Sequence, residues 1–87
     1  MTRMDKIRSL LAVLQSEQLE LVDESHLHAG HAGVREGGGH YRLKIVSGEF
    51  AGKSTVARHR MIYSALGDMM KLEIHALNIT ASTPDNQ

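Results

Sequence analysis

One stretch of the chain, HYRLKIVSGEFAGKSTVARHRMIYSALG at residues 40–67, decides the order of the central elements. Its first part alternates apolar and charged side chains, which is typical of a strand with one buried face. The apolar members of this alternation are Tyr41, Leu43 and Ile45. The glycines on either side of Phe50 predict a tight connection, and Ser54 or Thr55 can then cap a helix. The stretch therefore predicts a strand followed by a helix.

The flanking elements follow from the same kind of periodicity. The helix ending this stretch has one stripe at helical spacing, formed by His59, Ile62, Leu66 and Met69. Gly67 is a natural stop for that helix, and Asp68 is expected to cap a short extra turn. Apolar spacing also predicts a helix over residues 3–15. Residues 19–23 and residues 74–81 are predicted to be strands.

The predicted order is helix, strand, strand, helix, short helix, strand. This order indicates the α+β class, as an αββαβ sandwich in which a three-stranded mixed sheet has its helices packed on one face. The first two strands are expected to pair across the glycine-rich residues 24–39. A chain of 87 residues is long enough for one domain with a small aliphatic core. We therefore expect a single domain over residues 1–87, with residues 82–87 as a flexible tail.

Histidines are concentrated in one part of the chain. Four of the six lie within residues 26–40, namely His26, His28, His31 and His40. Neutral imidazole is a common ligand of transition metals, so such a segment can present nitrogen ligands at a surface. His75, near the start of the last predicted strand, is expected to form a two-nitrogen half-site with His28 or a neighbour. Because structural zinc takes four ligands, a further loop histidine or a partner must supply the rest.

Composition argues against several classes of function. Ten Lys and Arg balance ten Asp and Glu, so no global field attracts nucleic acid or an anionic membrane. The chain has no cysteine, which excludes disulfides and thiolate sites within it. No apolar run approaches the length of a membrane span, and the opening residues lack a signal-peptide pattern. We expect a cytoplasmic protein without a membrane partner, and the absence of an evident catalytic triad or carboxylate pair predicts no enzymatic activity.

Three short motifs bear on phosphate or nucleic-acid binding. The end of a P-loop is mimicked by GEFAGKS, but only three residues separate Gly48 from Gly52 where the motif has four. The sequence GHAG at residues 30–33 fits the GxxG loop of KH domains, yet it lies between two predicted strands rather than two helices. The better candidate is a local basic strip formed by Lys53, Arg58 and Arg60.

Four blocks of the chain together resemble the BolA family over residues 19–84. In order, the blocks are LELVDESHLHAGH, HYRLKIVS, FAGKSTVARHRMIYSAL and IHALNITASTP. The resemblance implies an αββαβ fold similar to class II KH domains, without their GxxG loop between helices. It also implies a non-enzymatic adaptor that forms a heterodimer with a monothiol glutaredoxin and shares a [2Fe–2S] cluster with it. Glutaredoxin and its bound glutathione would supply the thiolates.

The resemblance assigns roles to particular residues. The C-terminal ligand of the family matches His75, and the variable ligand in the loop between the first strands matches His28, with His26 and His31 as substitutes. Without cysteine, the chain resembles the all-histidine type of the family. No cofactor is expected in the isolated chain, which is expected to be a monomer or weak homodimer. A partner or nucleic-acid surface is expected from Phe50, Gly52, Lys53, Arg58 and Arg60.

Two other functions remain open at this stage. Bacterial members of the family are known for roles in stress response, cell morphology and transcription, so a DNA-binding regulator that uses Arg58 is one alternative. The other is a zinc-binding loop, in which His26, His28 and His31 together bind the metal in the isolated protein.

Overall fold

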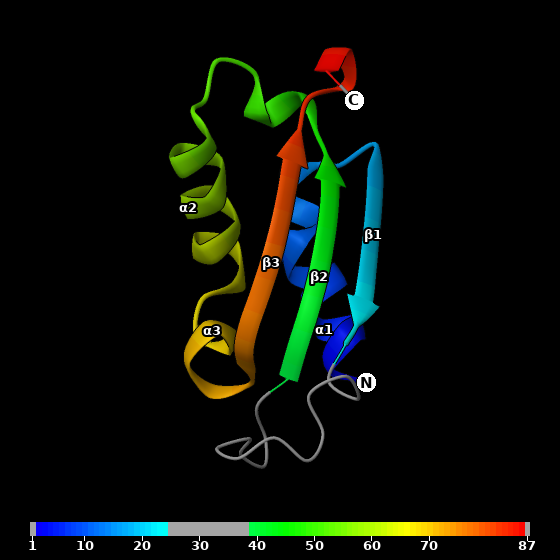
Figure 1. Cartoon of the computed structure of the whole chain (residues 1–87), viewed down its shortest axis with the longest axis vertical. Coiled ribbons are helices and arrows are strands. Elements are labelled where there is room, and N and C mark those ends of the chain that lie inside the picture. The colour runs from blue at the N-terminus through cyan, green and yellow to red at the C-terminus, as the bar shows by residue number, and fades with distance from the viewer. Residues whose placement is uncertain (1, 25–38, 87) are drawn as a thin grey trace.

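The central strand of the sheet is β2 (Gly39–Val46) (Figure 1). Its side chains alternate between a buried face and an exposed face. The computed structural model describes residues 2–24 and 39–86. Tyr41, Leu43 and Ile45 are buried on the helix side, while Arg42 and Lys44 are exposed on the other side. This alternation is the one expected from the sequence, and it leaves one face of the sheet open.

Two strands flank β2. On one side β1 (Gln18–Asp23) pairs with it antiparallel, and on the other β3 (Ile74–Ser82) pairs with it parallel, so the sheet order is β1-β2-β3. The prediction of a three-stranded mixed sheet in an α+β fold is confirmed. The parallel pair has an irregularity at its start, because Gly39 is opposite Ile74 whereas His40 is opposite Ala76. His75 is therefore an extra residue in β3 at this bulge.

The helices are α1 (Arg3–Leu11), α2 (Thr55–Leu66) and the short α3 (Met69–Leu72). Seen from the open face, α1 lies behind the sheet, while α2 runs alongside β3 and leads into α3 (Figure 1). Burial of one side of each longer helix closes the core; its fully buried side chains include Ile7, Leu11, Leu43, Ile45, Phe50 and Ile62.

Local signals set the helix ends, with two differences from expectation. As predicted, Ser54 caps α2 by accepting a hydrogen bond from the Ala57 amide, and Gly67 ends α2 at φ 55°. The predicted helix over residues 3–15 is shorter, because α1 gives way to a 3₁₀ turn at Ala12–Leu14. Asp68 is the N-cap residue of α3, as expected, but its carbonyl rather than its carboxylate accepts the hydrogen bonds, from the Lys71 and Leu72 amides.

The C-terminal residues continue directly from the sheet. Ser82 is the last residue of β3, and its carbonyl accepts a hydrogen bond of 2.9 Å from the Ser47 amide. Thr83 is buried, and a 3₁₀ turn follows at Pro84–Asn86. Residues 82 and 83 therefore belong to the packed part of the fold.

Candidate functional site

One end of the sheet carries His40 and His75, the second of which is a predicted ligand. Because β2 and β3 are parallel and β1 is antiparallel to β2, β1 ends where the other two strands begin (Figure 1). The Glu24 amide donates to the His40 carbonyl at 2.8 Å, and the Gly39 amide donates to the Glu73 carbonyl at 3.1 Å. These backbone bonds fix the positions from which His40 and His75 project.

The two histidines at this end are close to each other. The ring centroids of His40 and His75 are 4.9 Å apart, and the ring planes are inclined by 44°. His75 is exposed, and His40 is half-buried. The bulge adds His75 between two paired positions of β3, which places its ring beside that of His40 although His40 is paired with Ala76. The result is a pair of imidazoles on two hydrogen-bonded strands.

Close packing and ion pairs next to the two histidines hold the end of the sheet in place. Gly39 is buried, and a side chain there would overlap the buried ring of Tyr41. Glu73, just before β3, forms ion pairs with Arg3 at 3.6 Å and Lys6 at 3.3 Å, which tie α1 to the beginning of β3. A hydrogen bond with Tyr41, then the charges of Tyr41 and Glu73, raise the pKa of Arg3 against the opposing effect of desolvation.

The predicted loop ligands His26, His28 and His31 lie outside the described residues. Their segment is bounded by Glu24 and Gly39, both at the sheet end that carries His75. Among the residues that the structure describes, no group of three or more His, Asp or Glu side chains could hold a metal ion. Within residues 2–24 and 39–86, the structure thus places one pair of imidazoles, His40 and His75, at this end of the sheet.

The sequence groups His40 with the other histidines of residues 26–40, but it does not predict His40 as a ligand beside His75. Only the register of β2 against β3 brings it to His75. A parallel register joins residues 35 positions apart, and no local pattern in the sequence encodes it.

The predicted partner or nucleic-acid surface is only partly a surface. Phe50 is fully buried, so its inclusion was wrong: the 3₁₀ turn Gly48–Phe50 places its ring in the core. Gly52, at φ 75°, and Lys53 are exposed. His59 is half-buried and packs edge-on against Tyr63, with ring centroids 6.4 Å apart, rather than lying in the core.

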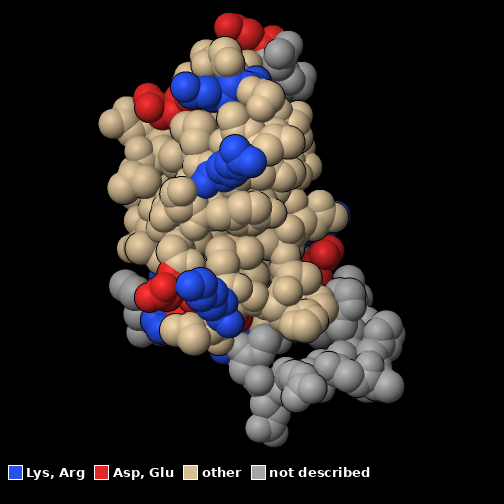
Figure 2. Space-filling view, turned by 90° about the vertical axis from the view of Figure 1, so that its left-hand side faces the viewer, with Lys and Arg blue, Asp and Glu red and all other residues tan. Residues whose placement is uncertain are grey.

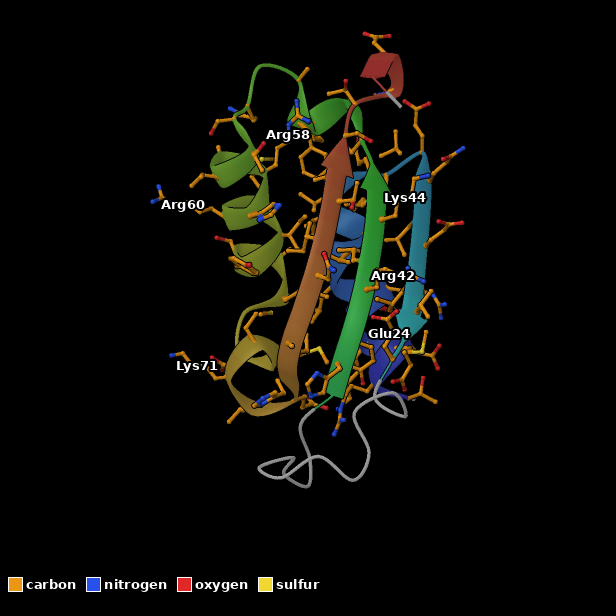
Figure 3. The ribbon with its side chains drawn as sticks, in the orientation of Figure 1. Glu24, Arg42, Lys44, Arg58, Arg60 and Lys71 are labelled. Carbon is orange, nitrogen blue, oxygen red and sulfur yellow. The ribbon has the colours of Figure 1, made fainter. Side chains whose placement is uncertain are left out.

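The two arginines of that surface have different environments. Arg58 is half-buried, and its guanidinium donates to the Lys53 carbonyl at 3.0 Å and to the Ala81 carbonyl at 3.1 Å. Arg60 is exposed and points away from the sheet (Figure 3). Two residues along a helix correspond to a rotation of about 200°, so their side chains point in nearly opposite directions. The basic strip is therefore divided between a structural arginine and an exposed one.

The surface on the α2 side agrees with this division. Figure 2 shows separate Lys and Arg side chains on a largely uncharged surface, rather than one continuous basic patch. On the open face of the sheet, Arg42 forms an ion pair with Glu24 at 3.5 Å, which offsets part of its charge. No helix among residues 2–24 and 39–86 combines the length and the apolarity that crossing a membrane requires.

Fold and site together define a small α+β domain that presents a histidine pair at one end of a mixed sheet. The chain belongs to the BolA family, because the family model described as BolA-like protein matches residues 10–86. It is 50% identical over 76 residues to SufE-like protein 1, chloroplastic/mitochondrial, of Arabidopsis thaliana. That match covers 82% of this chain but only 20% of the relative.

Two further comparisons extend this assignment. The solved BolA domain of SufE1 from Arabidopsis thaliana superposes with a TM-score of 0.84 at 45% identity, and the match covers 98% of this chain and 95% of that one. The relative named DNA-binding transcriptional regulator BolA, from Escherichia coli strain K12, is 39% identical over 85% of this chain and 68% of its own length. The family and its fold are thus shown for this chain.

Proposed function

We propose that this chain is a non-enzymatic adaptor that forms a heterodimer with a monothiol glutaredoxin and shares ligation of a [2Fe–2S] cluster with it. The observation that carries the proposal is the exposed His75, held at a strand start beside a second imidazole. A half-site of two nitrogens needs a partner to complete the coordination of an iron, which normally takes four ligands. The chain has no cysteine, so the thiolates come from glutaredoxin and glutathione.

The residues of this chain would hold and orient rather than react. His75 supplies one nitrogen ligand, and the sequence prediction names His28 as the second, with His26 or His31 as substitutes. Histidine ligation at one iron raises the reduction potential of such clusters relative to all-thiolate ligation. Backbone bonds at Gly39 and Glu24 keep the sheet end in place while the partner binds. We place this activity in the cytoplasm, with a monomer or weak homodimer as the state of the chain alone.

The first test mixes the purified chain with a cluster-loaded monothiol glutaredoxin and glutathione. Wild type, His75→Asn and His59→Asn are compared by visible circular dichroism and by size-exclusion chromatography. We expect a heterodimer with an altered cluster spectrum for wild type and for His59→Asn, since His59 lies on α2 against Tyr63. His75→Asn should lose or change that spectrum. An unchanged glutaredoxin spectrum and no heterodimer with wild type would exclude the adaptor function.

A second candidate function is DNA binding, as in a transcriptional regulator. The name of the Escherichia coli relative favours it, and Lys53 and Arg60 are exposed cations. Phosphate contacts release counterions, so affinity would fall steeply with salt and weaken in the double variant Lys53→Ala, Arg60→Ala. Fluorescence anisotropy with duplex DNA across a salt series measures both effects. His75→Asn is the control, and a salt-independent signal would exclude this function.

A further inference from the structure

The relation between His40 and His75 has the dimensions of a chelate. Two imidazoles that bind one tetrahedral metal through Zn–N bonds of about 2.1 Å have ring centroids about 5 Å apart. The observed separation is 4.9 Å. Rings that only pack against one another have centroid separations of about 4.5–7 Å. The separation of His40 and His75 is therefore within the range that binding of one ion through both imidazoles requires, and it also fits ring packing.

The support of the two rings is stiff for a surface site. His40 and His75 belong to adjacent strands of one sheet, and the bonds Glu24 to His40 and Gly39 to Glu73 bracket them. The Glu73 side chain is held by Arg3 and Lys6 of α1. Sites built on strands hold their ligands more accurately than sites on loops. Both ligands come from described residues and need no contribution from residues 25–38.

We propose that His40 and His75 together form a two-nitrogen site for one borderline transition-metal ion, with its remaining coordination positions left for a partner. Zn²⁺ is the natural probe, because it binds imidazole and needs no oxidation or reduction. Resting on the proposed function, the same inference makes His40, rather than His28, the second histidine ligand of the shared cluster. The isolated chain would then bind metal weakly, and the complex with glutaredoxin would bind it tightly.

The site itself is tested on the isolated full chain by titration with Zn²⁺, followed by ¹H–¹⁵N correlation spectra of the imidazoles. We expect His40 and His75 to shift together with one midpoint, and His40→Asn or His75→Asn to weaken binding at least about tenfold. His59→Asn is the matched control and should leave the titration unchanged. Shifts confined to the other histidines, or no Zn²⁺ response of His40 and His75, would overturn the site and leave only ring packing.

The assignment of the cluster ligand is tested in the complex with cluster-loaded glutaredoxin. Pulsed electron paramagnetic resonance of the reduced cluster detects the nitrogen couplings of its histidine ligands. We expect two such couplings in wild type and in His28→Asn, and one in His40→Asn. Two couplings in His40→Asn with one in His28→Asn would overturn the assignment while the adaptor function stands. If wild type forms no complex, the adaptor function fails, and the Zn²⁺ titration still decides the two-histidine site.

Thermal unfolding by far-ultraviolet circular dichroism shows whether each variant is folded. His40 is half-buried, so His40→Gln provides a second replacement that keeps a polar side chain of similar reach. If His40→Asn is unfolded, His40→Gln takes its place in both measurements. Zn²⁺ binding retained at wild-type strength by a folded His40 variant would overturn the proposal.

Discussion

At the scale of single residues, backbone conformation constrains the turn between α2 and α3. Gly67 has φ 55° and ψ −128°, a combination that side chains with a Cβ rarely adopt. Its amide still donates to the Tyr63 carbonyl at 2.9 Å, which closes the last turn of α2. This reversal lets Met69 return to the core and aligns the start of β3 with β2.

Gly67→Ala is expected to lower the free energy of unfolding by about 1–3 kcal/mol, because alanine is strained in this region of φ and ψ. Urea denaturation followed by circular dichroism measures the change. Gly48→Ala is the control, since a Cβ there meets nothing within 4 Å. An equal effect of both substitutions would show that the conformation of Gly67 is not the cause.

At the scale of elements, α1 begins with a reciprocal cap. The Thr2 hydroxyl accepts from the Asp5 amide at 3.1 Å, and the Asp5 carboxylate accepts from the Thr2 amide at 3.2 Å. The bond from the Thr2 backbone, then that from its side chain, lowers the pKa of Asp5 below 3.8. The ionised carboxylate also has a favourable interaction with the N-terminal end of the helix dipole.

Because the folded pKa of Asp5 is lowered, its contribution to stability is complete above the unfolded value near 3.8 and is lost as the pH falls through the folded value. Wild type should therefore be more stable than Asp5→Asn at neutral pH, and this advantage should vanish in strong acid. Thermal melts across a pH series measure the difference. Asp68→Asn, which removes no side-chain cap, is the control. A difference that stays constant in acid would contradict the expectation.

Helix α2 and the edge strand β3 are joined by Arg58. Its bonds to the Lys53 and Ala81 carbonyls link the start of the helix to the end of the strand. Charge-assisted hydrogen bonds contribute about 1.5–3 kcal/mol each in mutational series. The role of Arg58 is thus structural, which the basic strip in the sequence did not indicate.

Arg58→Ala is expected to reduce the unfolding free energy by about 1–3 kcal/mol, which is less than the sum of two charge-assisted bonds, because Arg58 is only half-buried and water can replace part of both bonds. Arg60→Ala should stay within about 0.5 kcal/mol, as is usual for an exposed side chain. Chemical denaturation of the two variants gives the comparison. Equal unfolding free energies of the two variants would exclude a structural role of Arg58. A loss of DNA binding in Arg58→Ala would reflect altered folding unless Arg60→Ala behaved in the same way.

At the scale of the whole molecule, the balance of charge governs behaviour in solution. The formal net charge is zero at pH 7 with histidine neutral, and the pI is about 7.0. Below its pI the chain carries a net positive charge. Long-range repulsion between copies is therefore least near neutral pH.

Solubility is expected to be lowest near pH 7 and to rise on acidification, because the chain is cationic below its pI of about 7.0. Precipitation by polyethylene glycol across a pH series measures this. A variant with three exposed neutral residues changed to glutamate, Gln15→Glu, Gln18→Glu and Asn78→Glu, should shift the minimum to lower pH. A minimum that does not move would show that attractive contacts, rather than net charge, set the solubility.

The sequence by itself determined the order of the elements, the alternation of β2, the Ser54 cap and the Gly67 stop, because each depends on neighbours within a few residues. It also predicted His75 as a site residue, first from its place near the start of the last strand and then from the resemblance to the BolA family. Tertiary structure decided the rest. Phe50 is buried because its turn folds inward. Helix geometry points the side chains of Arg58 and Arg60 in nearly opposite directions, and only Arg58 reaches the Ala81 carbonyl of β3. The register with a bulge places His40 beside His75, and pairing between distant strands is a long-range packing outcome with no local signature.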